Sequence, residues 1–524
     1  MKTRPFAVLC FGGLAACAGY RPARFRERPP IMDARDTLPI AVPAFRRVPE
    51  SVYLSEVYLH RPIRETLDLS PYPDAGDVNS FDEVVRSSWF EPRVPDVGTM
   101  ARGPDTMGPP RPPFTILPDT ALGVASGGFF ISDARGLCFE VVVDPPDRPE
   151  MRTAAVAIAS RIMWALGFNT PAAHIVKVRP EDFWRAEGAP QDVPAILKAG
   201  AAPSSGFYRV AALAWPPSVQ LGYSPDRGVR GDDPNDLVPH EDRRTLRTLG
   251  VFASFIGLEG LGHSKTLDAY VGAPREGHVV HFVAGLDSAL GASNVVRATD
   301  PPPVEGGGSP FVRLVTLGLA PNPPPTPTQV DVLAVGALDP RFDPASFAPS
   351  MRFEPTGRLL PADAYWAAKR VAHLSPTHIA LAVDAGHYGD RRAQRMMQAA
   401  LEARRLGLVR YWFARATPIE VVSLMGTRLA LGDEAVKVGL LRPDETDYRI
   451  DFFTSNGNAA ADPRVVRPSD GKVDFTLPDG ALVAARDYLV VQVTARRGDR
   501  MLPRAFELHM KLVGDRPIVV GIRH

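Results

Sequence analysis

The chain has 524 residues, and its 60 lysines and arginines nearly balance its 59 aspartates and glutamates, so the formal net charge is only +1. This balance gives no overall electrostatic attraction to nucleic acid, and no nucleic-acid partner is expected. Beyond the first residues, no apolar run reaches the roughly 18 residues of a membrane span. The 54 prolines predict long irregular connections.

The N-terminus has the pattern of a secretory signal. Lys2 and Arg4 precede an apolar stretch over 6–14 that is too short for a permanent membrane helix. The stretch ends in Leu14-Ala15-Ala16-Cys17, which resembles a bacterial lipobox, the site at which a cysteine takes diacylglycerol. We therefore expect 1–16 to be a lipoprotein signal peptide and Cys17 to carry the lipid anchor.

Lipidation implies a location in the bacterial cell envelope, on the periplasmic or surface face of the outer membrane. The alternative is a plain signal peptide, with Cys17 incidental. Cys10 is lost with the signal and Cys17 is acylated, so Cys138 stands alone and no intramolecular disulfide is expected. The core must then be held together by packing.

Two segments without regular periodicity follow the lipobox. Residues 17–50 are rich in proline and arginine and are expected to form a semi-extended tether. Residues 51–114 are expected to be an irregular N-terminal extension. Regular patterns then cover 115–414, which we expect to be one domain.

Within this domain, apolar residues on either side of the turn Asp133-Ala134-Arg135-Gly136 predict a β-hairpin over 127–143. Apolar residues at helical spacing predict a helix over 150–166, stopped by Gly167. A second hairpin is expected over 266–284. Further helices are expected over 240–256, 362–374, 376–385 and 390–406, the last ended by Gly407.

Two polar patterns in this domain invite a metal-site interpretation. The loop Ser224–Asp242 carries five aspartates, but their spacing fits no EF-hand, so a solvated acidic loop is expected. His278 and His281 have HxxH spacing, but residues i and i+3 of a strand point to opposite faces. We expect these two to be loop or core histidines, and no metal.

The last residues, 415–524, change character. Residues such as Phe506, Leu508 and Met510 alternate with polar residues, which is the period-two pattern of a half-buried strand. Strands are expected over 448–453, 473–477, 488–495, 505–512 and 517–522. Strands joined by turns without helices between them suggest a small β-sandwich-like domain.

Eight short motifs lie between 87 and 415. They are Ser87-Ser88-Trp89-Phe90, Ala101-Arg102-Gly103-Pro104, Asp144-Pro145-Pro146 with Pro149-Glu150-Met151, Ala165-Leu166-Gly167-Phe168, Thr266-Leu267-Asp268, Ser288-Ala289-Leu290-Gly291, Asp363-Ala364-Tyr365-Trp366 and Arg410-Tyr411-Trp412-Phe413. In these motifs and their order, the chain resembles a family of uncharacterised bacterial secreted proteins and lipoproteins with a kinase-like fold, which look like distant relatives of spore-coat and HipA-like atypical kinases. The resemblance implies an α+β fold, with a two-lobed protein-kinase-like domain followed by the β-rich domain.

Phosphoryl transfer needs a strand lysine, a helix glutamate, an Asp and an Asn in the catalytic loop, and a metal-binding Asp. The resemblance places Val142 and Val156 at the lysine and glutamate positions. Gly260 replaces the catalytic Asp, and Lys265 replaces the Asn. Gly285 stands at the metal-binding Asp. Valine cannot neutralise a phosphate and glycine cannot ligate magnesium, so the resemblance implies no catalytic residues and no cofactor.

The expected function is therefore that of a pseudokinase-like, membrane-anchored binding or scaffolding protein, with an envelope polymer or a protein as partner. The alternative is an atypical phosphotransferase. Glu259 or Asp287 would then act from a position shifted by one residue.

Overall fold

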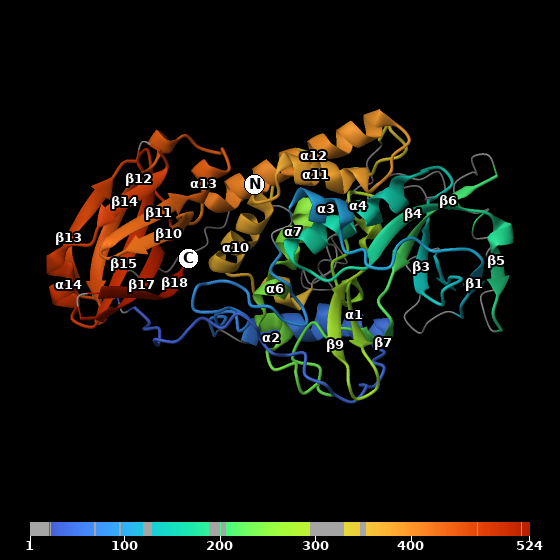
Figure 1. Ribbon diagram of the computed structural model, residues 1–524, viewed down its shortest axis with the longest axis horizontal. Coiled ribbons are helices and arrows are strands. Elements are labelled where there is room, and N and C mark those ends of the chain that lie inside the picture. The colour runs from blue at the N-terminus through green and yellow to red at the C-terminus, as the bar shows by residue number, and fades with distance from the viewer. Residues whose placement is uncertain are drawn as a thin grey trace, which may run out of the picture. The chain divides into compact units, whose positions relative to one another are not determined.

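The computed structural model describes residues 20, 22–67, 70–93, 96–118, 128–187, 197, 200, 206–293, 330–345, 353–468, 470–514 and 516–524. The chain forms two compact units. The first, here the α/β unit, comprises Ile31–Ala416. The second, here the β unit, combines the first 30 residues with Thr417–His524. Helices and several separate sheets occur together, which confirms the expected α+β class (Figure 1).

A six-stranded sheet forms one part of the α/β unit, with the strand order β4-β6-β3-β2-β1-β5. Its strands are β1 (Phe114–Ile116), β2 (Phe129–Ser132), β3 (Cys138–Val143), β4 (Ala172–Val178), β5 (Phe183–Arg185) and β6 (Tyr208–Ala214). All neighbours pair antiparallel except β1 and β5. The hairpin expected over 127–143 is confirmed as β2–β3 from residue 128 onward; Gly127 lies outside the described residues.

The helix expected over 150–166 is confirmed as α4 (Met151–Leu166), which is buried along almost its whole length and packs against β3, β4 and β6. Asp144 satisfies its first turn by accepting hydrogen bonds from the Thr153 backbone N–H (2.9 Å) and hydroxyl (2.8 Å). Gly167 ends the helix with a φ of +117°, a conformation that favours glycine. Asp144 therefore fixes the start of the helix and Gly167 its end, while the apolar periodicity accounts for the buried residues between them.

The rest of the α/β unit is a three-stranded sheet with helices around it (Figure 1). The strands are β7 (Ser218–Tyr223), β8 (Thr266–Val271) and β9 (His278–Val283), and β8–β9 confirms the second hairpin. The helices are α6 (Arg244–Arg247), α7 (Leu249–Ile256), α9 (Glu354–Gly357), α10 (Pro361–Ala372), α11 (Pro376–Asp384) and α12 (Arg391–Phe413). The end predicted at Gly407 is wrong, because Leu408 and Phe413 are buried and their packing continues the helix.

The N-terminal extension is more regular than predicted. Residues 50–67 form continuous helical turns, namely α1 (Glu50–Ser55), the π-helical turn Glu56–His60 and α2 (Arg61–Leu67), and α3 covers Val97–Arg102. Tyr53, Val57 and Arg61 are buried at helical spacing. The pattern was not recognised in the sequence because an arginine is normally expected to be exposed to solvent. Here Arg61 is buried, and its charge is paired with Asp226 at 2.7 Å.

The tether predicted over 17–50 is not a free linker where the structure describes it. Ala34, Ile40 and Arg46 each donate a backbone hydrogen bond to the α/β unit, at 2.8–2.9 Å. The side chain of Asp36 is buried and accepts hydrogen bonds from Ser88. Backbone pairing thus holds this extended segment along the surface of the unit.

The acidic loop is solvated only in part: Asp232 is exposed as predicted, but Asp233 and Asp236 are buried. Asp236 accepts from Arg243 (2.7 Å) and contacts the His240 ring nitrogen Nε2 at 2.9 Å. Burial opposes ionisation of Asp236, but these neighbours lower its pKa below the usual range. Arginines interleaved with the aspartates therefore neutralise the loop and allow it to pack inside the unit.

The β unit contains two sheets, with the orders β10-β11-β14 and β13-β12-β15-β17-β18; β16 pairs with β15. The strands are β10 (Ile419–Met425), β11 (Arg428–Asp433), β12 (Asp447–Thr454), β13 (Ala459–Val466), β14 (Lys472–Thr476), β15 (Tyr488–Arg497), β16 (Arg500–Met501), β17 (Phe506–Val513) and β18 (Arg516–Arg523), with short helices α13 (Glu434–Lys437) and α14 (Asp479–Ala485). The five predicted strands are present, whereas β10, β11, β13 and the two-residue β16 were missed. Phe452 of β12 contacts Phe475 of β14, with ring centroids 6.2 Å apart, so the two sheets share a core.

The described residues 20 and 22–30, here the N-terminal strap, complete the β unit. The Tyr20 hydroxyl donates to Glu507 (2.8 Å), and the Phe25 backbone N–H donates to the Tyr488 hydroxyl (2.8 Å). Phe25 also packs against His509, which the strap leaves 0% exposed. The alternating pattern predicted β17 correctly, but its polar face is covered by the strap instead of by water.

Candidate functional site

The two positions that the family resemblance assigns to a lysine–glutamate pair are apolar and buried. Val142 lies on β3 opposite Ala211 of β6 and is 2% exposed. Val156 lies in the middle of α4 and is 1% exposed. Neither position offers a charge to a phosphate, and both contribute to packing.

Two charged residues at or next to the positions assigned by the resemblance, Lys265 and Asp287, have their side chains bonded to other groups of the protein. Lys265, at the end of the 3-10 turn His263–Lys265, donates its Nζ to the Gly285 carbonyl oxygen and to the Ser288 hydroxyl (2.8 Å). Asp287, in the 3-10 turn Leu286–Ser288, is ion-paired with Arg152 of α4. Burial lowers the pKa of Lys265, and Arg152 lowers it further against the effect of Asp287.

The two glycines of these motifs have structural reasons to be glycine. Gly260 and Gly285 have φ values of +67° and +60°. A Cβ at Gly285 would lie 3.0 Å from Lys265 Nζ, so a side chain there would disturb the contacts of Lys265. Glu259 is half-buried and lies within electrostatic reach of Arg404. The structure thus bonds Lys265 to Gly285 and places Asp287 near them, where it pairs with Arg152.

No group of three or more His, Cys, Asp or Glu side chains within the described ranges is placed to hold a metal ion. His281 is a core residue that stacks on Trp89, with ring centroids 4.0 Å apart, and bonds Asp268 at 2.7 Å. His278, on the same strand, does not share this site. In the described part of the chain, no helix is both long and apolar enough to cross a membrane.

An apolar cavity of about 510 Å³ lies where β2 and β3 meet the connection from β6 to β7. Its lining has no charged side chain and consists of Phe45, Leu117, Phe130, Gly136, Leu137, Cys138, Trp215, Pro216, Pro217, Ser218 and Gln220. The buried Oε1 of Gln220 has no hydrogen-bond partner among the described residues. The size and the neutral, largely apolar lining suit a small apolar molecule.

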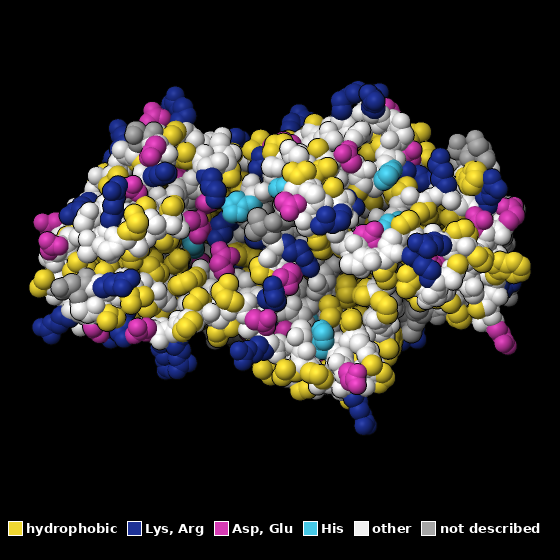
Figure 2. Space-filling model, viewed as in Figure 1, with side chains coloured by type: hydrophobic (Ala, Val, Ile, Leu, Met, Phe, Trp, Pro, Cys, Tyr) yellow, Lys and Arg dark blue, Asp and Glu magenta, His cyan; other side chains and the backbone are white. Residues whose placement is uncertain are grey.

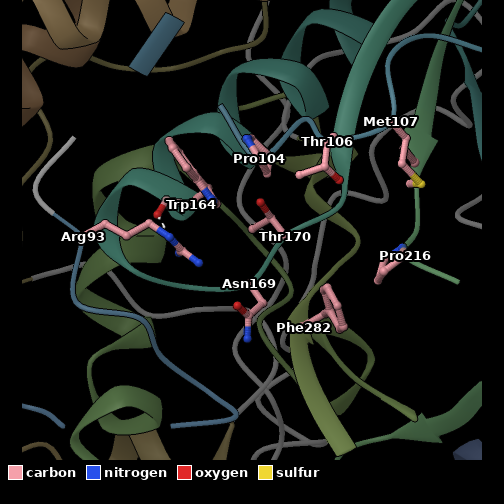
Figure 3. Close-up of a pocket in the computed structure, with 11 residues that line it drawn as sticks. Arg93, Pro104, Thr106, Met107, Trp164, Asn169, Thr170, Pro216 and Phe282 are labelled. Carbon is pink, nitrogen blue, oxygen red and sulfur yellow. Dashed lines mark hydrogen bonds between the residues drawn. The ribbon is translucent and has the colours of Figure 1, made fainter. Parts of the chain in front are cut away.

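A second cavity, of about 280 Å³, is shown in Figure 3 and lies beside the C-terminal half of α4. The buried and half-buried polar side chains in its lining, Arg93, Asn169 and Thr170, already have partners. Arg93 donates to the carbonyl oxygens of Trp164 (3.1 Å) and Phe168 (3.0 Å), and Asn169 donates to Ser88 and His281. Burial lowers the pKa of Arg93 to about 10. These side chains hold the backbone at the end of α4 in place, so few of their hydrogen-bonding groups are left for a ligand.

Comparison with known proteins found no match, either among protein-family models or among curated proteins. Positive and negative side chains are interspersed over the face of the molecule in Figure 2, without a large area of one sign. The site must therefore be interpreted from its own chemistry.

Sequence reasoning missed both Arg152 and the apolar cavity. Arg152 gave no signal because its partner, Asp287, is 135 positions away. The cavity did give one, since Phe129, Phe130 and Ile131 are consecutive apolar residues in a strand. Such a run indicates that both faces of the strand are covered.

Proposed function

We propose that this protein is a membrane-anchored binding protein of the bacterial cell envelope, built on a kinase-like fold that does not transfer phosphate. Cys17 carries the anchor, and the α/β unit provides the ligand site. The β unit contacts an envelope polymer or a protein partner.

The order of elements supports the kinase-like interpretation. In a kinase, a strand lysine meets a glutamate on the helix that follows the strand. Here α4 follows β3 along the chain and packs against it. The absence of a charge at Val142 and Val156 then removes the chemistry while preserving the packing.

The observation that carries the proposal is the contrast between the two parts of the site. Arg152 and Asp287 are buried and ion-paired with each other, and the half-buried Lys265 donates to Gly285 and Ser288, whereas the cavity presents a neutral, largely apolar lining. A buried, mutually paired cluster is costly to open for a metal–nucleotide complex. An apolar cavity needs no such rearrangement.

We expect Mg·ATP to leave the melting temperature of the purified protein unchanged. A ligand at 100 times its Kd would stabilise the fold by about 2.7 kcal/mol, which a thermal-shift titration detects easily. Nucleotide-dependent stabilisation that Asp287→Ala or Glu259→Ala abolishes would instead favour the atypical phosphotransferase.

We expect the cavity to bind N-phenyl-1-naphthylamine, a neutral apolar dye with one N–H donor. Cys138→Trp fills the cavity and should abolish the fluorescence increase on binding. Val219→Trp is the matched control, because Val219 is exposed on neighbouring β7 and is not part of the lining. Equal dye binding by Cys138→Trp and Val219→Trp would exclude the cavity as the ligand site.

A further inference from the structure

The N-terminal strap is bound to one face of the sheet that contains β15, β17 and β18. Tyr20 stacks beside Phe453 of β12, with ring centroids 4.6 Å apart, and donates to Glu507. Arg24 forms an ion pair with Asp487 at 2.9 Å. Glu27 is ion-paired with Lys511. The strap therefore touches β12, the start of β15 and β17 within about eight residues of chain.

Phe25 is the central contact of the strap. Its ring packs with Tyr488, Val490 and Val520, and it lies under the Arg523 guanidinium at 5.4 Å. Gly521 leaves the space that the ring occupies, because a Cβ at this position would overlap the Phe25 ring. Phe25 is partly buried, so its ring contributes less than the roughly 1.5–3 kcal/mol of a fully buried phenylalanine, and the hydrogen bonds and ion pairs of the strap add to it.

Only three peptide units separate Cys17 from Tyr20. A fully extended chain spans at most about 3.6 Å per residue, so the two residues lie no more than roughly 11 Å apart. The headgroup region on each side of a bilayer is itself several ångströms thick. A lipid on Cys17 thus leaves no linker long enough to lift the β unit away from the membrane.

We infer that the β unit rests directly on the membrane, with the strap-covered sheet toward the lipid headgroups. This inference rests on the proposed lipidation of Cys17. Arg26 and Arg28 are exposed on the strap and form no ion pair with any residue that the structure describes. Exposed arginines at this position suit anionic headgroups.

Two label positions on the β unit test the orientation. Ala459 of β13 is exposed and pairs with Phe453, the neighbour of Tyr20. Met425 of β10 is exposed on the other sheet and is the matched control. Full-length lipoprotein with Ala459→Cys or Met425→Cys, each in a Cys138→Ser background, is labelled with a nitrobenzoxadiazole dye. The protein is then reconstituted into phosphatidylcholine–phosphatidylglycerol vesicles that contain headgroup spin-labelled lipid.

We expect the spin label to remove most of the emission at 459 and little at 425. Phe25→Ala and Gly521→Ala disturb the same contact from opposite sides, and each should reduce the quenching at 459 to the level at 425. Palmitate incorporation is measured in every sample. Equal quenching at both positions in palmitate-labelled protein would overturn the membrane orientation while the anchor stands. Absence of palmitate would overturn the anchor and the orientation together.

Discussion

Asp268→Asn is expected to lower the free energy of unfolding by about 3–5 kcal/mol, the usual cost of breaking a buried ion pair. Asp268 is 0% exposed on β8. It accepts from Arg230 Nη1 at 2.9 Å, from His281 Nδ1 at 2.7 Å and from the Ser224 hydroxyl. An asparagine keeps the shape of the side chain but removes the buried charge opposite Arg230, which then keeps only the ion pair of its Nε with the partly exposed Asp232 at 2.9 Å.

Ionisation of the same carboxylate should make the free energy of unfolding depend on pH in the acid range. Burial opposes its ionisation, but His281, Ser224 and Arg230 outweigh that effect and lower the pKa of Asp268 to about 2. A folded-state pKa below the unfolded value of about 3.9 means that this stabilisation is complete above pH 4 and is lost as the pH falls toward 2. Urea midpoints measured from pH 7 to 2 should therefore fall more steeply in the wild-type protein than in Asp268→Asn.

Asp339→Asn is the control in the same unit. The Asp339 side chain is 62% exposed and lies 3.9 Å from an exposed Arg341, so its loss should change stability by less than about 0.5 kcal/mol. If Asp268→Asn unfolded at the same urea concentration as Asp339→Asn, the buried pair would not be stabilising.

Gly167→Ala is expected to destabilise the α/β unit by about 2–4 kcal/mol, from a strained backbone and an overpacked contact. The residue has a φ of +117°, and a Cβ there would overlap the ring of Phe90. Chemical denaturation monitored by circular dichroism measures the loss.

Gly108→Ala separates the two contributions. Gly108 also has a positive φ, +70°, but has no neighbour within 4 Å of a built Cβ. Only the conformational cost remains, about 1 kcal/mol. Equal losses in the two variants would mean that Phe90 moves aside freely and that the contact at Gly167 is not restrictive.

The sequence predicted correctly those helices and strands whose boundaries depend on residues close together in the chain. Gly167 ends α4 as expected, because both the apolar periodicity and the left-handed end are local. Gly407 does not end α12, because the burial of Phe413 depends on contacts far along the chain, such as that with Tyr365. The helical turns over 50–67 were missed for the same reason, since Arg61 is buried where it pairs with Asp226 and Glu354, which lie far along the chain.

The candidate site also has one part that could be predicted from the sequence and another part that could not. The sequence itself showed which residue types stand at the positions assigned by the family resemblance, namely Val142, Val156, Gly260, Lys265 and Gly285. The structure adds that Val142 and Val156 are buried and that a side chain at Gly285 would approach Lys265 closely. The pairing of Arg152 with Asp287 and the free acceptor of Gln220 depend on tertiary arrangement. No spacing rule connects such residues, so only the fold could reveal them.

The strap also determines when the β unit can be completed during synthesis. Its residues are made first, whereas its partners on β15, β17 and β18 are among the last to be made, more than 450 positions later. Closing so long a loop is slow, and the strap cannot cover the final strands until these strands have been made. The strap residues therefore stay away from their sheet while the rest of the chain is synthesised and bind to it only at the last step of folding.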